Sequence, residues 1–162
     1  MKALVVFDSV FGNTEKIAQA VGEGARAALG SQEEVEVLRV GQVQPQQWAG
    51  VGYLIVGSPT RAFQATPATK RFLKQIPNSA LKGVKVAAFD TRILPGDTGS
   101  AVLRFFVKIF GYAAQPMANR LQQKGGQLVV PAEGFIVKGT EGPLQEGELE
   151  RAAAWGRQIA AA

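Results

Sequence analysis

Residues 8–14 read Asp8-Ser9-Val10-Phe11-Gly12-Asn13-Thr14 and separate a strand pattern from a helix pattern. An apolar run covers residues 3–7, and apolar side chains at helical spacing follow over 14–29. The first-turn N–H groups of a helix have no partner within the helix, and the helix dipole favours negative charge there. A strand, a loop with hydroxyl groups and glycine, and then a helix predict a phosphate-binding loop.

The same loop has a simpler interpretation, in which Ser9 or Thr14 only caps the helix and Gly12 serves the turn. It is not a P-loop, because no lysine follows the glycine in the required position. A string close to the dinucleotide fingerprint, Gly22-Glu23-Gly24-Ala25-Arg26-Ala27, lies within the predicted helix and not after a strand. We therefore do not interpret that string as a nucleotide site.

Strand and helix patterns alternate along the whole chain, which predicts an α/β fold. The predicted strands are 2–7, 35–40, 51–57, 84–89 and 127–130, the last resumed at 135–137, and the predicted helices are 14–29, 67–76, 99–111, 116–124 and 146–161. Five β–α units predict one domain over residues 1–162, with a single doubly wound, five-stranded parallel sheet. Thr66 before Pro67 predicts the cap of the second helix.

The composition excludes several kinds of site. The chain has no cysteine and no histidine, so it holds no disulfide, thiol nucleophile, Ser-His-Asp triad or His- or Cys-ligated metal. The spacing of Asp and Glu suggests no metal-binding loop. Any redox chemistry would need a bound organic cofactor. The apolar run after Lys2 is too short for a signal peptide, so we expect a cytoplasmic protein.

Positive charge is concentrated in the middle of the chain. Residues 61–124 carry eleven Lys or Arg against two Asp, a net charge of +9, which leaves −4 for the rest of a chain of net +5. This basic region favours an acidic protein or a membrane surface as partner, and no nucleic acid is expected. The predicted helix 99–111 has a second apolar face, which suggests either a homodimer or partner contact or cover by the following loop.

Three loops follow predicted strands: residues 8–14, 57–63 and 90–99. In open α/β sheets ligands bind beyond the carboxyl ends of the strands, where the strand order reverses. We therefore expect the three loops to form one site. Asp97-Thr98-Gly99-Ser100 in the third loop matches an aspartic-protease string, but there is one copy in an α/β chain, so we predict a helix cap there.

The first of these loops resembles the phosphate loop of the flavodoxins, [ST]-x-[TS]-G-[NQ]-T, with Phe11 in place of its middle hydroxyl residue. Ser58-Pro59-Thr60 resembles the first flavin-flanking loop of the family, and the loop after Phe89 corresponds to the second. The resemblance covers essentially the whole chain. It implies a strand order of 2-1-3-4-5, non-covalent FMN, and electron transfer between a reductase and an acceptor protein, with no catalytic side chain.

The resemblance places the FMN-binding residues in the three loops. They are Ser9, Val10, Phe11, Gly12, Asn13, Thr14, Ser58, Pro59, Thr60, Arg61, Ala62, Phe63, Asp90, Thr91 and Arg92. The chain departs from the family where an aromatic residue and a glycine are usual, since Arg61 and Ala62 stand there. The usual tyrosine of the second flanking loop has no counterpart among Ile93, Leu94 and Pro95, and the chain is basic.

These departures leave two alternative functions open. Ser58-Pro59-Thr60-Arg61 is similar to the quinone reductases of the tryptophan-repressor-binding-protein type, which suggests an NAD(P)H- or quinone-dependent flavin oxidoreductase, although the histidine of those enzymes is missing. The other alternative is a binding module with weak or no FMN binding. Arg61 is interpreted either as a cation that favours the anionic reduced flavin or as an exposed loop charge. Arg92 has the same first interpretation, with a salt bridge as the alternative. Phe63 is interpreted either as a residue that covers the flavin or as part of the hydrophobic core.

Overall fold

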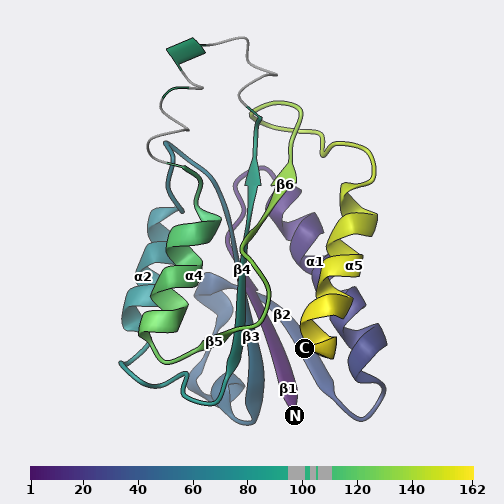
Figure 1. Cartoon of the computed structure of the whole chain (residues 1–162), viewed down its shortest axis with the longest axis vertical. Helices are drawn as coiled ribbons and strands as arrows, with labels where there is room; N and C mark the ends of the chain where they lie inside the picture. Colours follow the sequence, from purple (N-terminus) through teal and green to yellow (C-terminus); the bar gives the residue numbers. More distant parts are fainter. Residues whose placement is uncertain (95–100, 103–104, 106–110) are drawn as a thin grey trace.

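A parallel sheet forms the centre of the molecule, with helices on both of its faces (Figure 1). The computed structural model describes residues 1–94, 101–102, 105 and 111–162. The strands are β1 (Lys2–Phe7), β2 (Glu34–Arg39), β3 (Val51–Pro59), β4 (Lys85–Arg92), β5 (Gln127–Leu128) and β6 (Glu133–Ile136). All of their pairings are parallel, and the order β2-β1-β3-β4-β5 confirms the predicted topology.

The fifth position of the sheet differs from the prediction, because two short strands share it. β5 pairs with Lys85 and Val86 at the start of β4, whereas β6 pairs with Phe89 to Arg92 at its end. The sheet therefore has six strands and not five. The break includes Pro131, which has no N–H group to donate to a neighbouring strand.

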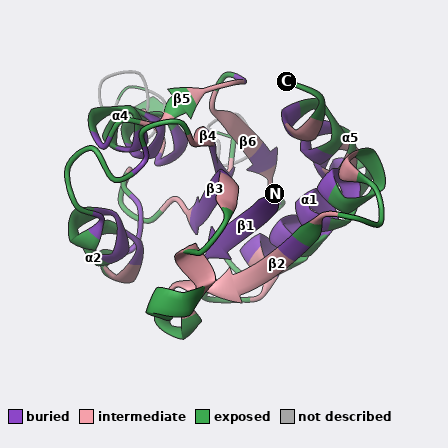
Figure 2. Cartoon of the chain, turned by 90° about the horizontal axis from the view of Figure 1, so that it is seen from below, coloured by how far each residue is buried: buried purple, intermediate pink, exposed green. Residues whose placement is uncertain are grey.

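Among the described residues, two helices cover each face of the sheet (Figures 1 and 2). Helices α1 (Asn13–Leu29) and α5 (Glu148–Ala161) lie on one face, and α2 (Pro67–Gln75) and α4 (Ala114–Gln123) on the other. Short 3-10 helices, η1 (Val40–Gln42) and η2 (Pro45–Trp48), follow β2. The strands separate two hydrophobic clusters, one centred on Phe89, Phe135 and Trp155 and one on Leu54, Met117 and Leu121.

The predicted helix 99–111 and the Asp97-Thr98-Gly99-Ser100 string fall almost entirely outside the described residues. The predicted cap of α2 is confirmed, since the Thr66 hydroxyl accepts a hydrogen bond from the Thr69 N–H at 3.3 Å. No helix within the described ranges is both long and apolar enough to cross a membrane.

One glycine of the fingerprint-like string, Gly24, serves helix packing. A Cβ atom on Gly24 of α1 would lie 2.0 Å from the Ala153 carbonyl oxygen of α5, and one on Gly156 of α5 would lie 2.2 Å from the Val21 carbonyl oxygen. Both distances are far shorter than a van der Waals contact, so the two helices approach closely only because these residues have no side chain. The string lies inside α1, as the sequence predicts.

Candidate functional site

The loop between β1 and α1 leaves helix N–H groups unpaired. Gly12 adopts a φ of 91°, a left-handed conformation that glycine accommodates without strain, and the helix begins at Asn13. The Ser9 hydroxyl accepts hydrogen bonds from the N–H groups of Gly12 at 3.0 Å and Glu15 at 3.4 Å. Within the described part of the chain, the N–H groups of Asn13 and Thr14 meet no protein acceptor. These two groups are therefore available to an anion.

A cavity of about 290 Å³ lies at the carboxyl ends of the strands. It is lined by Val10, Phe11, Asn13, Thr14, Pro59, Thr60, Arg61, Ala62, Thr91, Arg92, Ile93, Val137, Gly139 and Thr140. The structure thus brings the three predicted loops together around one hollow. Five residues of the predicted site do not line it: Ser9, Gly12, Ser58, Phe63 and Asp90.

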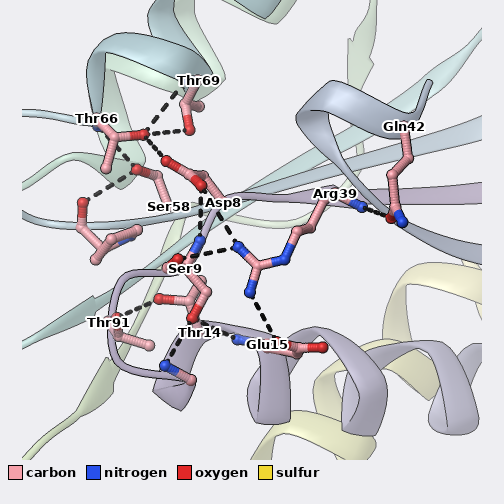
Figure 3. A network of polar contacts seen from close by, with 12 residues as sticks. Asp8, Ser9, Thr14, Glu15, Arg39, Gln42, Ser58, Thr66, Thr69 and Thr91 are labelled. Carbon is pink, nitrogen blue, oxygen red and sulfur yellow. Dashed lines mark hydrogen bonds and ion pairs between the residues drawn. The ribbon is translucent and has the colours of Figure 1, made fainter.

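Hydroxyl and carboxylate groups join the loops behind the cavity (Figure 3). The hydroxyl groups of Thr14 and Thr91 are 2.8 Å apart, which links the first loop to the third. The Thr66 hydroxyl donates to the Asp8 carboxylate at 2.6 Å, and the Thr66 N–H donates to the Ser58 hydroxyl at 3.0 Å. Ser58 thus holds the start of α2, and its role in the structure is to support the site from behind.

Arg39, at the end of β2, clamps the first loop and was not predicted (Figure 3). Its guanidinium donates to the Ser9 carbonyl oxygen at 3.0 Å and to the Glu15 carboxylate at 2.9 Å. The guanidinium also lies 5.3 Å from the centre of the Phe7 ring. A sequence signal existed, because Arg39 falls inside a predicted strand that ends at the same edge of the sheet.

Asp90 and Arg92 form an ion pair in the cavity wall. Asp90 is fully buried and accepts two hydrogen bonds from Arg92, at 2.6 and 2.8 Å, and one from the Ala114 N–H at 2.8 Å. Burial raises the pKa of the Asp90 carboxyl, while Arg92 and the Ala114 N–H act in the opposite direction. The salt-bridge interpretation of Arg92 is thus realised in the structure, and Arg92 lines the cavity as well.

The Arg92 guanidinium also fits closely between two neighbours. It lies 3.8 Å from the centre of the Tyr112 ring, within the range of a cation–π contact. On the β6 side, a Cβ atom on Gly134 would lie 2.1 Å from the guanidinium carbon. Glycine at position 134 therefore makes room for Arg92. This pairing could not be predicted from residue patterns, because positions 92, 112 and 134 meet only in the folded chain.

The second loop closes on itself in a tight turn. Arg61 and Gln64 exchange backbone hydrogen bonds at 2.8 and 2.9 Å. Between them Ala62 and Phe63 have φ values of 46° and 65°, in a region that residues with a side chain rarely adopt. This turn directs Phe63 to a hollow shared with Pro116 and not to the cavity.

Arg61 gives the cavity mouth a positive charge. Its guanidinium lies 5.7 Å from the centre of the exposed Phe11 ring. No carboxylate pairs with Arg61 among the residues that the structure describes. Among the described residues, the cavity lining includes Arg61 and Arg92 but no Asp or Glu, and this electrostatic character suits an anionic ligand.

The loop between β6 and α5 supplies a fourth wall that was not predicted. Val137, Gly139 and Thr140 line the cavity, and the loop returns on itself through a bridge between Val137 and Leu144. The side-chain amide of Asn13 donates to the Glu141 carbonyl oxygen at 3.1 Å. Asn13 thus ties this loop to the first one. The signal that could have found the loop is its place after a predicted strand, at the same edge of the sheet.

The family of the chain follows from a comparison with known proteins. The flavodoxin family model matches residues 5–155. The chain belongs to the flavodoxin family. A flavodoxin from Aquifex aeolicus is 36% identical to it over 75 residues, a match that covers 46% of this chain and 40% of that protein. The curated relative is therefore matched over less than half of its length.

Two solved flavodoxins share the fold over nearly their whole length, and a larger flavodiiron protein shares it over part of its length. An archaeal flavodoxin superposes with a TM-score of 0.77 at 22% identity, covering 99% of this chain and 97% of that one. Flavodoxin 1 from Bacillus cereus gives a TM-score of 0.75 at 18% identity, covering 99% and 98%. The flavodiiron protein of Giardia intestinalis gives 0.72 at 19% identity, with 99% of this chain matching 35% of that protein.

Proposed function

We propose that this chain binds FMN non-covalently in the cavity and carries electrons between a reductase and an acceptor protein. Flavodoxins bind FMN and pass electrons to redox partners. The bound flavin supplies the redox chemistry, and the protein supplies binding and electrostatics. The observation that carries the proposal concerns the N–H groups of Asn13 and Thr14, which have no protein partner among the described residues and lie at a cavity whose described lining contains no carboxylate.

The residues of the cavity fit the parts of FMN. A phosphate needs N–H and hydroxyl donors and positive potential, which the start of α1 provides. The backbone at Gly12 has open space around its Cα, so a ligand can approach it closely. Apolar side chains from three loops, Phe11, Pro59 and Ile93, offer surface for a planar ring system. Arg61, which has no carboxylate partner among the described residues, would favour negative charge on a bound ring, whereas the charge of Arg92 is compensated by Asp90.

Reconstitution with FMN tests this proposal. The purified protein is mixed with FMN, desalted and examined by visible absorption. We expect a retained flavin band with vibrational structure, at close to one FMN per chain. A colourless protein after desalting would contradict FMN binding and would favour a flavodoxin-fold binding module. The variant Thr14→Val, which removes a hydroxyl group but keeps the size of the side chain, should retain less FMN than the wild type.

A second candidate is an NAD(P)H- or quinone-dependent flavin oxidoreductase. The unpaired Arg61 beside the exposed Phe11 favours it, since together they could receive an anionic or planar substrate at the cavity mouth. Steady-state oxidation of NAD(P)H by a soluble quinone, catalysed by the FMN-loaded protein, would establish this activity. Absence of turnover in a protein that retains FMN would leave the electron carrier.

A further inference from the structure

A groove lies between α2 and α4, on the other side of the 61–64 turn from the cavity. We call it the α2–α4 groove. Its volume is about 310 Å³, and its apolar lining comprises Phe63, Ala65, Leu73, Pro116 and Met117. Ala65, Leu73 and Met117 are nearly buried, with exposed fractions of 9%, 4% and 2%, and form a floor, whereas Phe63 is half-buried and Pro116 is exposed.

Cations surround this floor. Lys70 and Lys74 of α2 and Arg120 of α4 line the groove and are exposed. No carboxylate lies within ion-pair distance of these three side chains in the described ranges of the chain. The sequence places no Asp or Glu anywhere in 67–75 or 114–123. The positive charge of the groove is therefore not neutralised within these helices.

The groove and the cavity share a wall. Ala62 lines the cavity and Phe63 lines the groove, and both belong to the tight turn closed by Arg61 and Gln64. Ala62 and Phe63 also line a further hollow together with Pro116 at the start of α4. A partner seated in the groove would thus lie next to the mouth of the FMN cavity.

We propose that the α2–α4 groove docks an acidic electron-transfer protein, which presents carboxylates around an apolar side chain. The proposal rests on the proposed function. An apolar centre with a charged rim is the usual anatomy of a protein interface, and opposite charge steers two proteins into productive encounters. A membrane fits less well, because membrane-binding surfaces need apolar side chains that protrude from the surface. Here three of the five apolar lining residues, Ala65, Leu73 and Met117, are buried in the floor of the groove, and none of the five belongs to the exposed large hydrophobic residues of the described chain.

The test uses a plant-type [2Fe–2S] ferredoxin, a small acidic one-electron carrier, as the probe. Its Kd is measured by calorimetry at low ionic strength for both the FMN-free and the FMN-loaded protein. The groove variant is the triple substitution Lys70→Gln, Lys74→Gln and Arg120→Gln. The matched control is Lys16→Gln, Lys82→Gln and Arg157→Gln, which lowers the net charge equally at exposed positions outside the groove.

We expect the groove variant to weaken ferredoxin binding about tenfold, the loss expected for three exposed ion pairs, and the control variant to weaken it by no more than about twofold. Added salt should weaken the wild type more steeply than the groove variant. The single variant Lys74→Glu should also weaken ferredoxin binding. Both triple variants should unfold at the wild-type temperature, because all six side chains are exposed.

Equal weakening in the two triple variants would overturn the proposal, since only net charge would then matter. Absence of ferredoxin binding at low ionic strength would also overturn it. Groove-dependent binding to phosphatidylserine vesicles without ferredoxin binding would assign the groove to a membrane surface instead. The FMN-free measurement keeps the two proposals apart, because failure to bind FMN would refute the proposed function while the groove would still be tested.

Discussion

The ion pair in the cavity wall offers a sharp test of how the site is held. Asp90→Asn keeps the shape of the side chain but removes its charge. The Arg92 guanidinium, whose side chain is only 20% exposed, then loses its counter-charge. Breaking a buried pair by removing one partner costs about 3–5 kcal/mol. Because Arg92 keeps its contact with Tyr112 and some access to water, we expect a loss near the lower end, about 3 kcal/mol of unfolding free energy.

Arg92→Gln removes the other partner of the ion pair, and the direction in which its unfolding free energy changes with pH follows from the pKa of Asp90. Burial raises the pKa of the Asp90 carboxyl and Arg92 opposes that rise, so removing Arg92 raises the pKa further. In the folded variant the Asp90 carboxyl then keeps its proton to a higher pH than it does in the unfolded chain. Stability therefore falls as the pH rises from the ordinary pKa of 3.8 through the folded value. We expect the variant to be closest to the wild type in acid and to differ most near neutrality.

The double variant Asp90→Asn/Arg92→Gln closes a thermodynamic cycle. With both charges removed, no uncompensated ion remains in the wall, so the double variant should be more stable than the sum of the single losses indicates. We expect a coupling energy of about 2–3 kcal/mol, measured by urea unfolding of the FMN-free protein at neutral pH. Additive losses, within about 0.5 kcal/mol, would refute the view that Asp90 and Arg92 act as one unit.

Three other substitutions test separate parts of the structure. Arg61→Ala should lower the reduction potential of bound FMN by about 20–40 mV, the effect of one exposed charge, and an unchanged potential would show that Arg61 is only a surface cation. Thr66→Val removes the cap of α2 and the bond to Asp8, so thermal unfolding should show a loss of about 1–2 kcal/mol, which Thr66→Ser should largely restore. Burial acts to raise the pKa of Glu148, but hydrogen bonds from Arg151 and a backbone N–H lower it overall, below its ordinary value of 4.5. The stabilisation by Glu148 is thus present above that value and is lost as the pH falls through the lower folded pKa. Glu148→Gln should therefore lower the free energy of unfolding by about 1–2 kcal/mol at neutral pH and by less in acid. A loss that stays the same at all pH values would contradict this role of the Glu148 charge.

Most elements of the parallel α/β fold could be predicted, because the strands are apolar runs of suitable length and the helices have clear periodicity and caps, whereas the strand order came from the resemblance to flavodoxins. Thr66-Pro67 is an example, since a cap is a local feature and appears in the structure as the sequence predicts. The interruption of the last strand was also predicted, since the sequence pattern stops at residue 130 and resumes at 135–137. That the second piece counts as a sixth strand depends on its pairing with the end of β4, which a strand pattern does not show.

The site was predicted less completely, because its support comes from distant parts of the chain. The three loops could be found from their place after strands, and most of their residues line the cavity. Arg39 and the 137–144 loop were missed, because their contacts with the first loop depend on where β2 and β6 end in space. Phe63 lies in the α2–α4 groove because the turn has positive φ values that residue types alone do not indicate.

A pair of titrations examines the phosphate loop on which the account depends. The FMN-free protein is titrated with FMN and with riboflavin, which has the same ring system but no phosphate, and Kd is read from flavin fluorescence. If the N–H groups of Asn13 and Thr14 receive the phosphate, FMN should bind at least about 100-fold more tightly than riboflavin, as two hydrogen bonds to a charged group require. Equal affinity for the two flavins would contradict a phosphate site at the start of α1.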